Sequence, residues 1–226
     1  LGFAIPGIFS ILSPSHSTPP GDAAMYFHIQ LIDNPATPEK RARSRPDHWQ
    51  YFDDHVDNFI ARGATYSDDM ETFLSSVLFV EFGDWDAVRA FIEKEPHNRN
   101  GVYKDVIIRR WNKGIERTQA EFPRKDGQVA WYFRGFAKPH MHVERMRFLA
   151  DHIAYFAPYD GTDFITRGGV FNDAGDQWQG SANLLCLPSR AAFQEFLEAE
   201  PFYVNGLYER VLIERYKFGG RPGQVV

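Results

Sequence analysis

The sequence predicts an α+β protein built from two copies of one β-α-β-β-α-β unit, and three observations support that prediction. The stretch His48–Phe52 returns as His152–Phe156, with His, Tyr and Phe at matching positions. Each copy continues through an Arg-Gly pair to an aspartate, Asp68 or Asp173. The third observation is a constant offset of 105 residues between Glu95 and Glu200, Pro96 and Pro201, Gly101 and Gly206, and Tyr103 and Tyr208. Self-similarity at a fixed spacing indicates a tandem duplication.

Size and composition agree with two small domains. The chain has 226 residues, which suits one large domain or two small ones, and the repeat favours two. Twenty Phe, ten Tyr and five Trp supply ample apolar surface for two buried cores. The net charge of -5 gives no electrostatic reason to expect a nucleic-acid partner.

The N-terminal stretch, the lack of a long apolar run and the single cysteine together indicate the cellular compartment of the protein. Residues 1–24 are expected to be a flexible extension, because a Pro/Ser/Thr-rich stretch precedes Met25 and the first strand; a degenerate export signal is the less favoured interpretation. No apolar run reaches the ~18 residues of a membrane span. Cys186 has no partner for an intrachain disulfide, which favours a reducing compartment and a cytoplasmic location.

The first repeat, residues 25–112, contains the elements of the unit in order. Residues 25–31 predict a strand. The basic run 40–45 is interpreted as a solvated loop or helix start, and a helix is expected from Pro46 to a stop at Gly63. The other expected elements are strands over 64–67, 73–82 and 102–111, and a helix that Asp84 caps and Pro96 ends.

A charged connector, residues 113–127, leads into the second repeat, residues 128–218. Its expected strands cover 128–136, 165–172, 180–187 and 207–217, and its expected helices cover 144–157 and 190–199. Ser189 is the predicted cap of the second of these helices. The Gly-rich tail 219–226 is expected to be loose.

A β-α-β-β-α-β unit is a ferredoxin-like arrangement, with four strands in one sheet and both helices on one face. Residues 77–80 are apolar on both sides of their strand, which indicates that the second face of the sheet is also buried. The simplest partner for that face is the other repeat. The predicted architecture is therefore two ferredoxin-like repeats packed sheet to sheet within one chain.

The residues of the first repeat resemble the YCII-related family. The resemblance is carried by Arg45–Tyr51, Gly63, Asp68, 91–96 and 101–111, and more faintly by 129–217. That family belongs to the dimeric α+β barrel group, which implies that the two repeats form an intrachain version of such a barrel. It also implies a His-Asp pair that transfers protons in a pocket between helix and sheet.

Carried over to this sequence, the pairs are His48 with Asp68 and His152 with Asp173. Histidine takes up and returns a proton near neutral pH, and a carboxylate on its other ring nitrogen fixes the tautomer. Arg45 fits the family's motif as an anchor for an anionic substrate. The second repeat has Leu149 in the matching region, so the first site is favoured. The alternative is a histidine that only hydrogen-bonds a neighbouring carboxylate as part of the core.

Three further residues are candidate substrate contacts: Arg134 on the first strand of the second repeat, and Tyr66 and Phe171, which precede the two aspartates by two positions. Surface exposure of Arg134 and core packing of the two rings are the alternatives. His140 and His142 have no evident third ligand, so no metal site is expected, and no organic cofactor either.

The expected function is proton transfer on a small cyclic or carbonyl compound, by isomerase, lactone or elimination chemistry. A non-catalytic ligand-binding or interaction module is the alternative, and cofactor-free oxidation is suggested by the wider superfamily alone. The expected assembly is a monomer with an internal pseudo-dimer, with further homo-oligomerisation left open.

Overall fold

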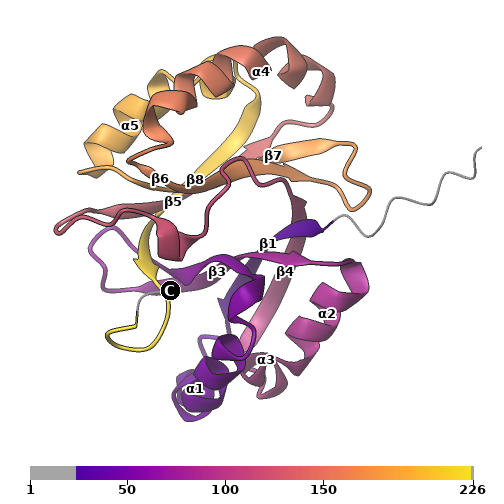
Figure 1. Ribbon diagram of the computed structural model, residues 1–226, viewed down its shortest axis with the longest axis vertical. Helices are drawn as coiled ribbons and strands as arrows, with labels where there is room; N and C mark the ends of the chain where they lie inside the picture. The colour runs from indigo at the N-terminus through magenta and orange to yellow at the C-terminus, as the bar shows by residue number, and fades with distance from the viewer. Residues whose placement is uncertain (1–23, 225–226) are drawn as a thin grey trace, which may run out of the picture.

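The computed structural model describes residues 24–224, and within them eight strands form one closed antiparallel barrel (Figure 1). The strand order is β1-β3-β2-β8-β5-β7-β6-β4. The two halves of the barrel face each other, and the helices of each repeat cover the outer face of their own half (Figure 1). The prediction of two ferredoxin-like repeats packed sheet to sheet is confirmed. The expected extension at 1–24 lies outside the described residues, except for Ala24.

Each repeat supplies four strands and the helices between them. The first contains β1 (Met25–Asp33), α1 (Pro38–Asp53), η1 (Val56–Asn58), β2 (Phe59–Tyr66), β3 (Phe73–Phe82), α2 (Trp85–Lys94), α3 (Pro96–Arg99) and β4 (Tyr103–Trp111). The connector carries a short helix, η2 (Gln119–Glu121). The second repeat contains β5 (Ala130–Ala137), α4 (His142–Phe156), η3 (Ala157–Tyr159), β6 (Phe164–Phe171), β7 (Trp178–Cys186), α5 (Arg190–Glu198), α6 (Pro201–Val204) and β8 (Tyr208–Phe218).

Two short seams close the barrel. At one seam β2 pairs with β8, from Gly63 opposite Phe218 to Tyr66 opposite Arg215. At the other, β4 pairs with β6 through Arg110 and Trp111. Closure leaves none of the eight strands with an open edge, which removes the usual site of edge-to-edge aggregation.

Alternation along the strands places side chains in three cores. Tyr132 and Ala182 point into the barrel with a cluster that includes Phe79 and Trp111. On β5 the residues on either side of Tyr132, Trp131 and Phe133, point outward against the helices of the second repeat. The third core lies between β1, β3 and the helices of the first repeat. Both faces of each sheet are thus buried, as the apolar run in β3 predicted.

The first helix differs from its prediction. It begins at Pro38, not near Pro46, and contains the whole basic run. Pro46 lies inside the helix, where it removes only the hydrogen bond to the carbonyl of Ala42, an exposed position. Phe59 and Gly63, assigned to the end of this helix, belong to β2. The helix forms despite the proline because Ser44, His48 and Phe52 are buried along one face.

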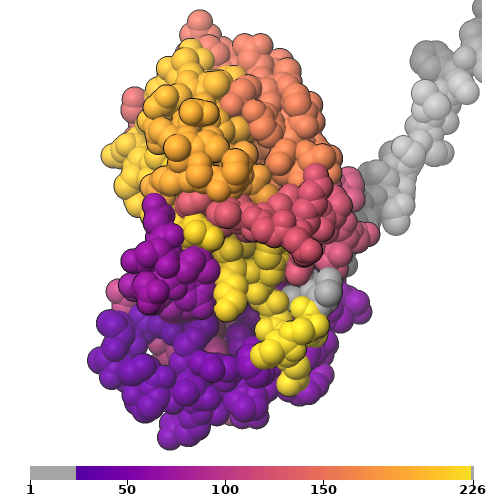
Figure 2. Space-filling model, turned by 90° about the vertical axis from the view of Figure 1, so that its left-hand side faces the viewer, coloured from indigo at the N-terminus to yellow at the C-terminus, as the bar shows by residue number. Residues whose placement is uncertain are grey.

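The predicted end of α2 before Pro96 is confirmed, and Pro96 is also the first residue of α3, which Glu95 caps. The tail is not loose over its described part, because Arg221 Nε and Gln224 Nε2 both donate to the carboxylate of Asp53, at 2.8 and 3.1 Å. Figure 2 shows the C-terminal segment lying against the first repeat. The helix caps at Asp84 and Ser189 are confirmed.

None of the helices in residues 24–224 is both long enough and apolar enough to cross a membrane.

Candidate functional site

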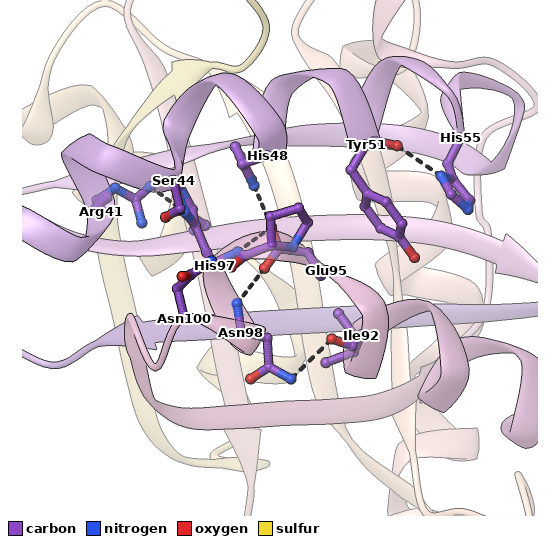
Figure 3. Close-up of polar contacts among 12 residues, drawn as sticks. Arg41, Ser44, His48, Tyr51, His55, Ile92, Glu95, His97, Asn98 and Asn100 are labelled. Atoms are coloured by element: carbon purple, nitrogen blue, oxygen red, sulfur yellow. Dashed lines mark hydrogen bonds and ion pairs between the residues drawn. The ribbon is translucent and has the colours of Figure 1, made fainter.

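His48 lies on the inner face of α1 and bonds the carboxylate of Glu95, with 2.6 Å between Nδ1 and Oε1 (Figure 3). Glu95 is fully buried and His48 is 9% exposed. The same carboxylate accepts hydrogen bonds from the backbone N–H groups of His97 and Asn98, at 3.0 and 2.8 Å. Glu95 therefore holds the first turn of α3 and the ring of His48 together.

This arrangement sets the protonation of the His48 ring. The three groups that hydrogen-bond Glu95 are nitrogens whose N–H groups can donate to its carboxylate, and the hydroxyl of the buried Tyr103 also lies near it. Nδ1 of His48 must then carry a proton. In the neutral ring Nε2 holds the lone pair, and it has no hydrogen-bond partner among the described residues. His48 is thus positioned to accept a proton through Nε2.

A cavity of about 380 Å³ lies beside His48, between α1 and the sheet of the first repeat. Residues from both repeats line it: besides His48 they include Arg41, Arg45, Arg62, Tyr66, Phe73, Phe218 and Gly219. The first site therefore depends on the end of β8 in the second repeat and on the start of the tail that follows it.

Three arginines give the cavity a positive character, and of these only Arg45 lacks an ion pair with a described residue. Arg41 forms an ion pair with Asp33, with 2.9 Å between Nη1 and Oδ1. Arg62 is buried and lies 3.3 Å from the carboxylate of Asp53. Arg45 forms no ion pair with any residue in 24–224. Arg45, together with the exposed Lys217 that also lines the cavity without an ion pair to a described residue, is available to an anionic ligand.

His97 supports the ring of His48 from one side. The two imidazoles are stacked, with centroids 4.1 Å apart and 10° between their planes. Nδ1 of His97 lies 2.6 Å from the hydroxyl of Ser44, which also donates to the carbonyl of Lys40 at 2.8 Å. Burial, and then the charges of His48, Arg41 and Arg45, lower the pKa of His97 to about 2. His97 is therefore neutral at every physiological pH.

His48, Glu95 and His97 lie close enough together to suggest a metal site. Their geometry argues against one. The lone pair of an imidazole nitrogen lies in the ring plane, so two parallel stacked rings direct their lone pairs side by side rather than toward one ion. Nδ1 of each ring is also engaged, with Glu95 or Ser44.

The second repeat contains a smaller copy of the site. Nδ1 of His152 lies 2.5 Å from Oε1 of Glu200, and Glu200 accepts from the backbone of Phe202 and Tyr203. The adjacent cavity has a volume of about 240 Å³ and is lined by Arg145, Leu149 and Arg167 among others. Leu149 stands where the first site has Arg45, and Phe202 stands where it has His97.

The structure does not bring the predicted aspartates to the histidines. Asp68 is exposed on the turn after β2 and pairs with Arg190 at 2.9 Å. Asp173 is exposed too, and its carbonyl accepts a hydrogen bond from Trp85. The predicted partners His48 and His152 bond Glu95 and Glu200 instead, because α3 and α6 pack directly against α1 and α4.

Two of the four predicted substrate contacts line the cavity at His48, and the other two do not. Arg45 and Tyr66 both line the cavity at His48. Phe171 lines neither histidine cavity and packs in the core of the second repeat. Arg134 points into the barrel, away from both histidines.

Sequence reasoning missed Glu95 and Glu200, although the signal was present. Both glutamates precede a proline, both recur at the offset of 105 residues, and each follows its histidine by a nearly constant interval. A recurring Glu-Pro is a candidate helix cap, and a capping carboxylate is fixed in place. That rigidity makes it a better partner for a histidine than an aspartate in an exposed turn.

Comparison with protein families finds a match, which covers the first repeat. Residues 25–112 match the model of the YCII-related domain. This confirms the resemblance over the first repeat. A comparison with curated proteins finds no match.

Solved structures share the fold. A chlorite dismutase from Candidatus Nitrospira defluvii, in complex with imidazole, matches with a TM-score of 0.55 and 9% identity, over 86% of this chain and 91% of that chain. An anthrone oxidase-like protein matches with a TM-score of 0.51 and 10% identity, over 88% and 92%. A 5-chloro-2-hydroxyhydroquinone dehydrochlorinase from Burkholderia phenoliruptrix AC1100, in complex with 2,5-dihydroxybenzoquinone, is 23% identical over 40% of this chain and 95% of that chain, with a TM-score of 0.37.

Proposed function

We propose that this chain, whose residues 25–112 match the YCII-related domain, is a small-molecule enzyme in which His48 moves a proton. The observation that carries the proposal is the pairing of His48 Nδ1 with the buried carboxylate of Glu95 at the wall of a cavity. Glu95 takes the role that the sequence alone had given to Asp68. No metal or organic cofactor is needed for the step.

Each group has a defined task in the reaction. Nε2 of His48 removes a proton from carbon next to a carbonyl group of the substrate, and the electron pair of the broken C–H bond passes to the carbonyl oxygen. Glu95 stabilises the imidazolium that forms and keeps the ring oriented. Return of the proton to a different atom completes an isomerisation, whereas loss of a leaving group completes an elimination.

The cavity suggests the class of substrate. A volume of about 380 Å³ suits a single-ring compound. Arg45 supplies an unpaired positive charge for a carboxylate or for the enolate oxygen, and Tyr66 and Phe73 offer aromatic surface. Small cyclic or carbonyl compounds with an anionic group fit these features. Chlorite dismutase, on the same fold, also acts on a small molecule.

A non-catalytic ligand-binding module is the second candidate, and one observation favours it. The His-Glu pair also occurs in the second repeat, beside a cavity that lacks the counterparts of Arg45 and His97. In both repeats the glutamate caps a helix. A role in joining two helices would by itself account for the pair.

Solvent deuterium exchange distinguishes the two candidates. Wild type, His48→Ala and His152→Ala are first screened by thermal shift against hydroxylated aromatics, lactones and small keto acids, since a ligand of the native state raises its stability. The hits are then incubated in D₂O and followed by proton NMR. We expect wild type and His152→Ala to exchange a C–H proton, and His48→Ala to lose exchange. Equal exchange by His48→Ala would rule out this mechanism, and binding without exchange by any variant would favour the module.

We further propose a cytoplasmic location, since Cys186 is buried and has no second cysteine with which to form a disulfide. Cell fractionation with an antibody against the chain tests this.

A further inference from the structure

We propose that the interior of the barrel holds a second ligand site, and that its ligand is a small organic carboxylate. A cavity of about 780 Å³ lies at one end of the barrel, lined by strands of both repeats. It shares no lining residue with the cavity at His48. The proposal is therefore independent of the proposed function.

Arg134 is the centre of this site. It is 5% exposed, and its Nη1 donates to the carbonyl oxygens of Gly135 and Ser181. No carboxylate in residues 24–224 forms an ion pair with it. A buried charge without a counterion is costly, and natural proteins pair such charges or neutralise them with a ligand. A bound anion would complete the environment of Arg134.

Two more arginines lie at the same cavity. Arg109 from β4 and Arg210 from β8 both line it, and neither forms an ion pair with a described residue. The guanidinium groups of Arg134 and Arg210 lie 4.4 and 3.7 Å from the ring centroid of Phe136. Among the described residues that line the cavity, Glu209 is the one acid, and it is exposed. Three guanidinium groups and the ammonium group of Lys138 thus lie around one cavity whose described lining has a single, exposed carboxylate.

His28 supplies an independent sign of a missing ligand. It lines the cavity at 2% exposure, and its Nε2 lies 2.9 Å from the hydroxyl of Tyr132. That hydroxyl has no other acceptor among the described residues, so it donates to Nε2 and leaves the ring proton on Nδ1. Nδ1 has no hydrogen-bond partner. A buried N–H without an acceptor is unfavourable, and a ligand oxygen would supply the missing acceptor.

Burial, with the charges of Arg134 and Arg109, holds the pKa of His28 well below its ordinary value. The ring is therefore neutral and acts as a donor, not as a further cation. The remaining surface is partly apolar, with Ile107, Phe136, Trp178 and Leu212 among the lining residues. Positive charge, the buried donor of His28 and apolar walls together suit an organic carboxylate.

Calorimetric titration with benzoate, and with benzamide as its neutral isostere, tests the proposal. Wild type is compared with Arg134→Met, which keeps an unbranched side chain of similar length, and with the exposed changes Arg109→Gln and Arg210→Gln. Arg45→Leu weakens any binding of benzoate in the cavity at His48 and so isolates the second site. We expect saturable binding of benzoate but not of benzamide, with a component that is kept in Arg45→Leu, is at least tenfold weaker in Arg134→Met and is weaker in the two glutamine variants.

Four results would overturn the proposal. These are no saturable binding of benzoate up to about 10 mM, equal binding of benzamide, equal affinity in wild type and Arg134→Met, or a loss of binding confined to Arg45→Leu. If circular dichroism shows that Arg134→Met is unfolded, Arg109→Gln and Arg210→Gln test the proposal in its place. Unchanged affinity for benzoate in both of these variants would contradict the site. Each outcome leaves the His48 proposal standing, because the two cavities are lined by different residues.

Discussion

The ring of His97 lies against the ring of His48, with centroids 4.1 Å apart, and Phe202 lies against His152 in the same way at 4.0 Å. The two repeats thus keep one stacking geometry but use a titratable ring in one and an apolar ring in the other. The second repeat therefore shows which substitutions the first should tolerate. Three of the predictions below use it as a guide or a control.

His97→Phe should make the protein more resistant to acid. His97 is neutral in the fold because its pKa is lowered to about 2, whereas the unfolded chain binds a proton below about pH 6.5. The wild type therefore loses stability as pH falls through 6.5, by about 2 kcal/mol between pH 7 and pH 5 from this residue. The variant should lack that loss. Urea denaturation at both pH values measures it.

The control for this change is Phe202→Tyr, which leaves His97 in place and should keep the wild-type dependence on pH. An identical loss of stability in wild type and His97→Phe would show that His97 is protonated in the native state.

Glu95→Gln should damage both stability and catalysis. Glu95 accepts three N–H bonds, and an amide has only one accepting oxygen, so a buried donor is left unpaired at about 1–3 kcal/mol. The imidazolium of His48 also loses its carboxylate, which should lower turnover by about 10²–10⁴-fold. Glu200→Gln is the matched control. It should cost similar stability in thermal denaturation and leave turnover unchanged.

Arg45→Leu should weaken binding of an anionic substrate while the fold is kept. Leucine is the residue at the matching position 149, and Arg45 is exposed at the cavity without an ion pair among the described residues. We expect KM to rise about tenfold with little change in kcat, as loss of one charged hydrogen bond implies. Arg43→Leu, an exposed change on the same helix that does not line the cavity, should have no effect. A similar rise in KM for both variants would contradict a specific role for Arg45.

Gly63→Ala should destabilise the seam between the repeats. A methyl group at Gly63 would overlap the carbonyl oxygen of Lys217 and the ring of Tyr216, both on β8. Overpacking of this kind costs about 1–3 kcal/mol. Gly83→Ala is the control, because nothing lies within 4 Å of its new methyl group. Guanidinium denaturation measures both, and an equal stability of the two variants would argue against tight packing at the seam.

The sequence by itself determined the order of the elements and the pairing of two similar repeats. Alternation in strands such as β1 and caps such as Asp84 and Ser189 are local features, so they can be recognised without the fold. The resemblance of the first repeat to the YCII-related family can likewise be recognised from the sequence without the fold. The sequence also contained the clue to Glu95, in the recurring Glu-Pro, although its role could not be recognised there.

Tertiary structure decided which groups meet. His48 bonds Glu95, and not Asp68, because α3 packs on α1 while the turn after β2 is exposed. The helix continues through Pro46 because burial of one face outweighs one lost hydrogen bond. Arg134 points into the barrel because a strand places alternate side chains on opposite faces. Which of those faces becomes the interior depends on the partner sheet, which lies far away in the sequence.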